Sequence, residues 1–147
     1  LSLHDALPIY GVAHKSTNGT TWTALAIGAS ISNSGARIVY DARRERFVLV
    51  AGAYTVLEST DNGVTWVSSS PNEDSIEGRP VGLGAGLTLV GMGGSGLYVG
   101  KGMAGWNRTS SGGLLNAGTD LRGIAYGLGR FVLAGTNGDI FTSLVVE

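Results

Sequence analysis

The stretch STDNGVTW, residues 59–66, places a carboxylate, an amide and three hydroxyls within eight positions. Oxygen ligands of this kind can bind a hard cation, and an acid beside hydroxyls can serve proton transfer. Calcium sites usually collect several carboxylates, however, and this stretch offers only Asp61. A tight turn is the alternative, because an Asp here can accept nearby backbone N–H groups and Asn-Gly tolerates the positive φ of a hairpin. We therefore predict a turn, with no metal and no cofactor.

A second candidate for acid–base chemistry is the pair His4 and Asp5, in the segment LSLHDALPI at residues 1–9. All nine residues resemble the translation of a short-read sequencing adapter, and they share no pattern with the remainder of the chain. We therefore predict that residues 1–9 are a non-native scar and exclude them from the fold. We also expect the natural N-terminus, with any signal peptide, to lie upstream.

The turn belongs to a repeated unit, and repeats of this length indicate a solenoid or a propeller. Its copies are KSTNGTTWTAL, ESTDNGVTWVS and the degenerate GKGMAGWNRTS, at residues 15–25, 58–68 and 100–110. A second element recurs in phase as RFVLVAG, GLTLVG and RFVLAG, at residues 46–52, 86–91 and 130–135. Because both elements recur about every 42 residues, we treat about 42 residues as the length of one structural unit.

Each unit contains four short segments that are rich in β-branched and aromatic residues and separated by turn residues. In the best copy they are RIVYDA, RFVLVAG, YTVLES and TWVSSS, at 37–42, 46–52, 54–59 and 65–70. No stretch shows a capped apolar period of 3.6 residues, so we expect essentially no helix. Four strands per unit are typical of a β-propeller blade, whereas a sandwich does not predict a recurring motif.

The predicted fold is therefore all-β, a β-propeller fragment of about three four-stranded antiparallel blades. We expect one partial propeller over residues 10–147, built as part of a blade, two blades and part of a blade at 10–34, 35–76, 77–118 and 119–147. Propellers close with about 4 to 8 blades. Missing blades or self-association are therefore expected to be needed to close the ring.

The best copy of the turn fits the pattern S-x-D-x-G-x-T-W with Ser59, Asp61, Gly63, Thr65 and Trp66. This motif resembles the Asp-box of the BNR-repeat family, a group of β-propellers that includes sialidases. The resemblance implies a hairpin between the third and fourth strands of a blade, with a structural and not a catalytic role. The preceding copy is one residue shorter and has an Asn in place of the Asp; its matching residues are Ser16, Asn18, Gly19, Thr21 and Trp22.

The resemblance also suggests a carboxylate site, because sialidases hold an acidic sugar with three arginines from different blades. Arg37, Arg79 and Arg122 each stand at the start of a predicted first strand. Arg37 lies three residues before Tyr40, whereas Arg122 lies four residues before Tyr126. Because side chains alternate between the two faces of a strand, the two arginines should face opposite ways unless one strand contains a bulge. The arginine-isoleucine-proline signature of sialidases and a nucleophile with a separate acid are also missing. We keep the three arginines as candidate ligand-binding residues and favour a role as surface arginines.

The charge of the chain narrows the possible partners. Charged residues make up 14% of the chain and the net charge is −1, so no basic stripe for nucleic acid is expected. No apolar run approaches the ~18 residues that span a bilayer. The cluster from Asp41 to Arg46 is predicted to be a solvated hairpin turn.

The leading functional hypothesis is a non-catalytic binding or scaffold propeller of a bacterial or phage surface or secreted protein, recognising a glycan or a protein. One alternative is a fragment of a sialidase-like glycoside hydrolase, and another is an intracellular assembly-factor propeller. We favour the non-enzymatic hypothesis and an extracellular or cell-surface location. The absence of Cys does not decide the compartment.

Overall fold

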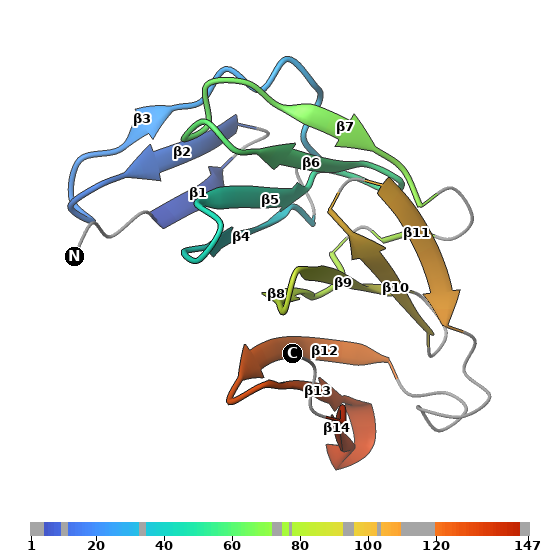
Figure 1. The fold of residues 1–147 in the computed structure, drawn as a ribbon. Coiled ribbons are helices and arrows are strands. Elements are labelled where there is room, and N and C mark those ends of the chain that lie inside the picture. Colours follow the sequence, from blue (N-terminus) through green and yellow to red (C-terminus); the bar gives the residue numbers. More distant parts are fainter. Residues whose placement is uncertain are drawn as a thin grey trace.

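The computed structural model describes residues 5–9, 12–32, 35–71, 75–76, 78–92, 96–102, 104–109 and 120–144. Within these ranges, fourteen strands form four antiparallel sheets, each with its strands in chain order (Figure 1). Sheet 1 contains β1 (Asp5–Ile9), β2 (Val12–Ser16) and β3 (Thr23–Ala24). Sheet 2 contains β4 (Arg37–Asp41), β5 (Arg46–Val50), β6 (Val56–Ser59) and β7 (Val67–Ser69).

The second half of the chain repeats this arrangement. Sheet 3 contains β8 (Val81–Gly84), β9 (Leu87–Met92), β10 (Gly96–Lys101) and β11 (Ala104–Thr109). Sheet 4 contains β12 (Leu121–Gly127), β13 (Arg130–Gly135) and β14 (Ile140–Thr142). The only helical element among the described residues is the 3-10 turn η1 (Thr136–Gly138). The prediction of an all-β propeller fold with four-stranded antiparallel blades and essentially no helix is thus confirmed.

Residues 5–9, which the sequence analysis left out of the fold, form an edge strand here. β1 pairs with β2 along its whole length, from Asp5 opposite Ser16 to Ile9 opposite Val12. Sheet 1 therefore includes half of the segment that resembles an adapter. The non-native origin of that segment stays a prediction, and His4 lies outside the described residues.

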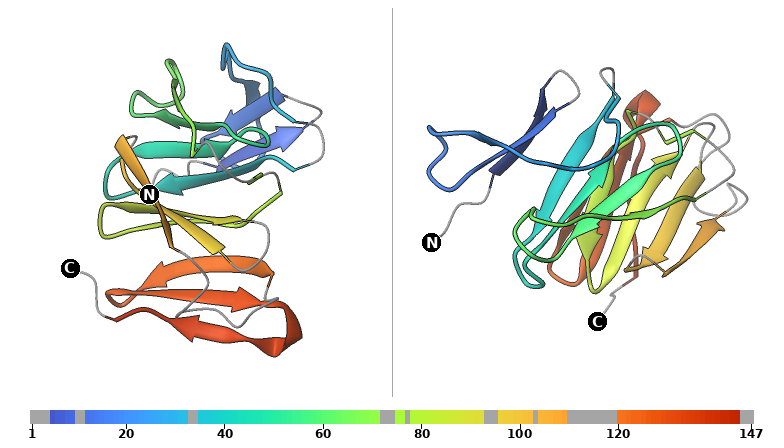
Figure 2. Two further views of the ribbon diagram at one scale, coloured as in Figure 1. Left: turned by 90° about the vertical axis from the view of Figure 1, so that its right-hand side faces the viewer. Right: turned by 90° about the horizontal axis from the view of Figure 1, so that it is seen from above.

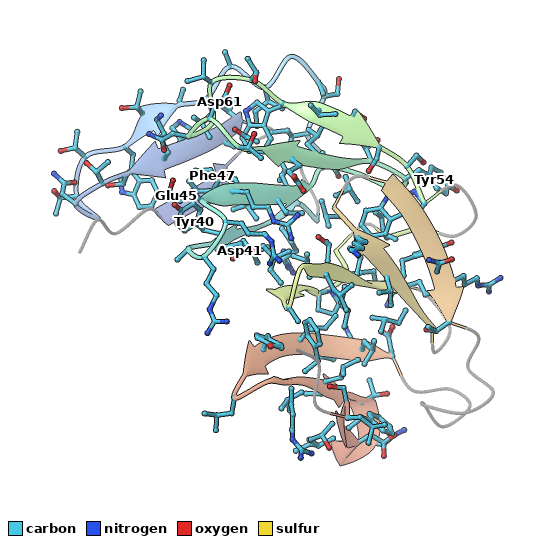
Figure 3. The ribbon with its side chains drawn as sticks, viewed as in Figure 1. Tyr40, Asp41, Glu45, Phe47, Tyr54 and Asp61 are labelled. Carbon is cyan, nitrogen blue, oxygen red and sulfur yellow. The ribbon has the colours of Figure 1, made fainter. Side chains whose placement is uncertain are left out.

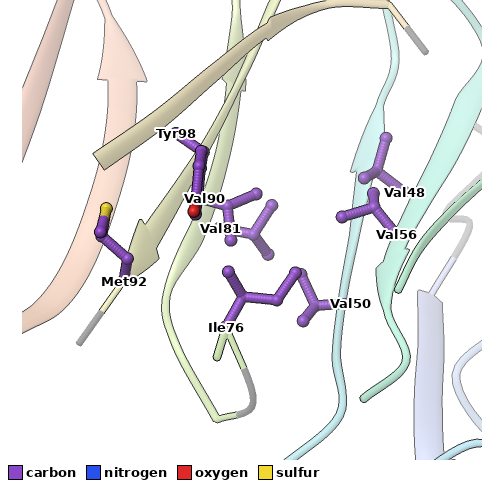
Figure 4. Close-up of a cluster of buried hydrophobic side chains, with 8 residues drawn as sticks. All are labelled: Val48, Val50, Val56, Ile76, Val81, Val90, Met92 and Tyr98. Atoms are coloured by element: carbon purple, nitrogen blue, oxygen red, sulfur yellow. The ribbon is translucent and has the colours of Figure 1, made fainter. Parts of the chain in front are cut away.

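The sheets stack through their faces, so the central strands are buried on both sides. All five residues of β5 are buried, because alternate side chains of the strand point toward sheet 1 and toward sheet 3. Leu49 belongs to the cluster between sheets 1 and 2, and Val48 and Val50 belong to the cluster between sheets 2 and 3 (Figure 4). A third cluster, which includes Leu89 and Phe131, joins sheets 3 and 4. This two-sided burial explains why β5 has a continuous apolar run and no alternation with polar residues.

The first strands of sheets 2, 3 and 4 lie side by side along the inner side of the arc. β4 contacts β8, and β8 contacts β12 (Figure 1). The approach of β8 to β12 requires glycine, because a Cβ at Gly82 would overlap Ile124 and one at Gly84 would overlap the ring of Tyr126. The starts of these three strands therefore meet at one end of the inner wall.

The four sheets form an open arc. Figure 2 shows sheet 1 at one end of the stack and sheet 4 at the other, and the described residues do not close a ring. In the described part of the chain, no helix is long and apolar enough to cross a membrane.

Candidate functional site

The STDNGVTW turn between β6 and β7 is held by its own side chains. Ser59 Oγ accepts the N–H of Gly63 at 2.8 Å and donates to Asp61 Oδ1 at 2.9 Å. The Asp61 carboxylate accepts the N–H of Val64 at 3.1 Å, the N–H of Thr65 at 2.9 Å and the hydroxyl of Thr65. Trp66 Nε1 donates to the carbonyl of Gly63 at 3.2 Å. Ser59, Asp61, Thr65 and Trp66 thus each hold the turn through their side chains. Gly63, which has no side chain, takes part through its backbone N–H and carbonyl.

These hydrogen bonds also change the acidity of Asp61. The hydroxyl and the N–H of Thr65 donate to the carboxylate and lower its pKa from 3.8 to about 2. A carboxylate stabilised in this way is a poor proton donor near neutral pH. Within the described residues, moreover, no group of three or more His, Cys, Asp or Glu side chains could hold a metal ion. The geometry therefore supports a structural turn.

The turn also fastens sheet 2 to sheet 1. Gly63 has a φ of 82°, and a Cβ on it would lie 2.9 Å from Leu25 Cδ2 of the neighbouring sheet. Lys15 Nζ donates to the carbonyl of Asn62 at 2.7 Å. Trp66 packs against the cluster between the two sheets, and Figure 3 shows Asp61 on the outer side of sheet 2.

The first copy of the motif repeats the network with an amide in place of the acid. Asn18 Oδ1 accepts the N–H of Thr20 at 2.9 Å and the N–H of Thr21 at 2.8 Å. Ser16 Oγ accepts the N–H of Gly19 at 2.8 Å. Trp22, the last matching residue, is partly buried. In this shorter copy an uncharged oxygen therefore accepts two backbone N–H groups, as the Asp61 carboxylate does in the longer one.

The three arginines meet at a different place, the inner end of the sheets. They line one pocket of about 290 Å³, together with Gly78, Pro80, Asp120 and Leu121. Arg37 is the first residue of β4, Arg79 precedes β8 by two residues, and Arg122 is the second residue of β12. The three guanidinium groups therefore come from at or just before the first strands of three different sheets.

A β-bulge brings Arg122 into this pocket. Leu121 pairs with Gly135 and Gly123 pairs with Ala134, so Arg122 is an extra residue in β12 with no opposing partner in β13. The bulge changes the alternation of the strand between Arg122 and Tyr126. It removes the objection, drawn from the spacing of the sequence, that Arg37 and Arg122 face opposite ways.

An acid that the sequence analysis did not single out organises the pocket. Asp120 Oδ1 pairs with Nη1 of Arg79, and Asp120 Oδ2 lies 3.0 Å from Nη2 of Arg122. The N–H of Asp120 donates to Thr136 Oγ1 at 3.1 Å, which holds the acid in place. Arg37 donates to the carbonyl of its neighbour Ala36 and is exposed. Only the position of Asp120, just before a first strand, could have indicated its role.

The pocket has the charge of an anion receptor. Three guanidinium groups face one carboxylate, which leaves an excess of positive charge, and Arg122 has a side-chain exposure of 68%. Guanidinium groups bind carboxylates and phosphates with two parallel hydrogen bonds. Among the described residues that line the pocket, Asp120 is the one acid, and neither Tyr nor Glu is present as a nucleophile. The arrangement can bind an acidic group but offers no pair for glycoside hydrolysis.

A second charged cluster is buried between sheets 2 and 3. The prediction of a solvated hairpin turn was wrong for Asp41 and Arg46, the two ends of the turn, which are both buried. Arg46 is 3% exposed, with Nη1 2.6 Å from Glu58 Oε2 and Nε 3.3 Å from Asp41 Oδ2. Its Nη2 also donates to Thr88 Oγ1 of sheet 3 at 3.4 Å. Figure 3 shows Asp41 and Glu45 at the hairpin that ends β4. The neighbouring sheet covers Arg46, which no local pattern could reveal.

Comparison with known proteins identifies the fold. No family model matches the chain, and no curated protein matches it in sequence. Among solved structures, YCF48 from Cyanidioschyzon merolae superposes with a TM-score of 0.66 at 13% identity, over 95% of this chain and 52% of that chain. Glutaminyl cyclase from Myxococcus xanthus superposes with a TM-score of 0.54 at 15% identity, over 98% of this chain and 68% of that chain.

Both neighbours are β-propellers, and at these identities the similarity concerns the fold alone. The chain has a β-propeller fold. It spans about half the length of the YCF48 chain that it matches. Membership of the BNR family, the role of the three arginines and the origin of residues 1–9 stay predictions.

Proposed function

We propose that this propeller is a non-catalytic binding module that recognises an acidic group of a glycan or a protein in the arginine pocket. The observation that carries the proposal is the convergence of Arg37, Arg79 and Arg122 from three sheets on one pocket with excess positive charge. Asp120 already pairs with two of these groups and keeps them in place. A ligand carboxylate would form hydrogen bonds with Arg37 and Arg122, the two exposed arginines.

The resemblance of the turn to the Asp-box supports a bacterial or phage surface or secreted protein as the setting. The resemblance to sialidases, which hold an acidic sugar with three arginines from different blades, supports the arginine pocket as the ligand site. The box itself stays outside the proposed site, because its polar groups are used within the turn.

Isothermal titration calorimetry with 3′-sialyllactose as the acidic probe and lactose as its neutral counterpart tests the proposal. Arg37→Ala should weaken binding of sialyllactose by roughly 10- to 100-fold, since hydrogen bonds to charged groups contribute about 1.5–3 kcal/mol. Arg43→Ala is the matched control, because Arg43 is an exposed arginine outside the pocket. Absence of binding, equal binding of lactose, or an affinity unchanged by Arg37→Ala would overturn the proposal.

A sialidase-like glycoside hydrolase is the second candidate, because that function uses three arginines in the same way. Its catalytic acid and nucleophile would have to come from residues outside the described pocket lining. Release of a fluorophore from a fluorogenic sialoside, abolished by Arg122→Ala, would favour the hydrolase over the binding module. An intracellular assembly factor would use the propeller as a protein-binding platform, and no contact in the described residues favours this third candidate.

A further inference from the structure

One face of sheet 4 exposes apolar side chains in a regular array. Alternate residues of β13 and β14, among them Phe131 and Phe141, pack toward sheet 3. The residues between them point the other way, and Val132 is 39% exposed while Ile140 is 70% exposed. We call this surface the free face of sheet 4 and define it by four exposed residues, Arg130, Val132, Ala134 and Ile140.

The free face corresponds position by position to a surface that is buried in sheet 2. Ala134 pairs with Ile140 as Val50 pairs with Val56. The ring pairs on the opposite face match as well, with centroids 4.8 Å apart for Tyr126 and Phe131 and 4.7 Å apart for Tyr40 and Phe47. Val132, Ala134 and Ile140 therefore occupy the positions of Val48, Val50 and Val56.

In sheet 2 these three positions form a sheet-to-sheet junction. Val48, Val50 and Val56 are all 0% exposed, because they pack against Val90 and Tyr98 of sheet 3 (Figure 4). The same positions of sheet 4 thus have the side chains and the register of a junction. Such an array on a free sheet face fits another β-sheet better than a small ligand.

Arg130 gives the free face a charge that its partner must complement. It occupies the position of Arg46, which two acids of its own sheet neutralise and which reaches Thr88 of the next sheet. The positions of those acids hold Gly127, opposite Arg130, and Thr142, opposite Val132. Since sheet 4 supplies neither acid at these positions, an oxygen acceptor on the docking surface would satisfy Arg130.

We propose that the free face of sheet 4 docks sheet 1 of a second copy of this chain, so that two copies join head to tail. The three junctions within the chain join sheets 1 and 2, sheets 2 and 3 and sheets 3 and 4, and each buries one apolar cluster. A fourth junction of the same kind would bury Val132 and Ile140 against the face of sheet 1 that carries Val12, which is 40% exposed.

The number of sheets in this chain is compatible with a ring of two copies. Two copies carry eight sheets, within the range of about 4 to 8 in which propellers close. Two identical head-to-tail junctions close the ring when a two-fold rotation relates the two copies, whereas a rotation that does not close gives open chains.

Sedimentation velocity of the whole chain at several concentrations tests the proposal. We expect a dimer of the native chain and a dissociation constant at least about tenfold weaker for the double variant Val132→Lys and Ile140→Lys, which would bury two charges. Both side chains are exposed in one copy, so the variant should keep the native circular dichroism spectrum. Val67→Lys is the matched control, because Val67 is 61% exposed on a strand outside the free face and should leave the dimer intact.

Four outcomes would overturn the proposal. These are a native chain that stays monomeric at all concentrations, a dimer that the double variant leaves unchanged, equal loss of the dimer in Val67→Lys, and assembly into open chains larger than a dimer. The test does not use sialyllactose, so its failure leaves the proposed binding function untouched.

Discussion

The carboxylate of Asp61 illustrates how a residue type that suggests chemistry can serve a turn. The carboxylate oxygens of Asp61 accept hydrogen bonds from Val64, Thr65 and Ser59 within the same turn. The first, shorter copy is held by analogous hydrogen bonds to Asn18, which carries no charge. At the arginine pocket the situation is reversed, because Arg37 and Arg122 stay exposed and face a space of about 290 Å³. At the scale of single residues, the satisfied groups are structural and the accessible ones are candidates for binding.

The acidity of Asp61 leads to a prediction about pH. Its pKa is about 2 in the folded protein against an ordinary value of 3.8, so the unfolded chain binds more protons between these values. The stabilising contribution is therefore present above pH 3.8 and is lost as the pH falls toward 2. Asp61→Asn should keep the turn, as Asn18 does, and should lose part of the acid sensitivity of the melting temperature. A difference in melting temperature between the native protein and this variant that stays constant from pH 6 to about 2 would contradict the account.

At the scale of elements, the local patterns determined most of what could be predicted. The four strands of the best copy and the hairpin turn at Asp61 follow from side-chain alternation and turn residues, which act over a few neighbours. The bulge at Arg122 could not be predicted, because it depends on the pairing of β12 with β13. The burial of Arg46 depends on Thr88, 42 residues away in another sheet. The pocket residue Asp120 was missed for the same reason, since its partner Arg79 is 41 residues away, in the segment before β8.

The junction of sheets 2 and 3 provides a prediction at this scale. Arg46→Met should destabilise the protein by roughly 3 kcal/mol or more, because it leaves the acids Asp41 and Glu58 without their buried partner. Arg130→Met changes the corresponding residue on an exposed surface and should alter the free energy of unfolding by less than about 0.5 kcal/mol. Urea unfolding at low protein concentration, where two copies stay apart, measures both values. Equal effects of the two substitutions would show that Arg46 does not join the sheets as described.

At the scale of the whole molecule, the inner ends of three sheets form the arginine pocket, and the outer turns hold neighbouring sheets together. The two functions are spatially separate, since Asp61 lies on the outer side of sheet 2 (Figure 3) and the pocket is lined by residues at the inner strands. The proposed ligand recognition at the pocket would use residues at the starts of sheets 2, 3 and 4, all of which the chain contains.

The most direct test of this account is a crystal structure of the protein grown with excess 3′-sialyllactose. We expect the carboxylate of the sugar in the pocket, within hydrogen-bond distance of the guanidinium groups of Arg37 and Arg122, with Asp120 still paired to Arg79. An empty pocket at a saturating concentration, or a sugar bound only at another surface of the protein, would contradict the claim that the three arginines form an anion-binding site.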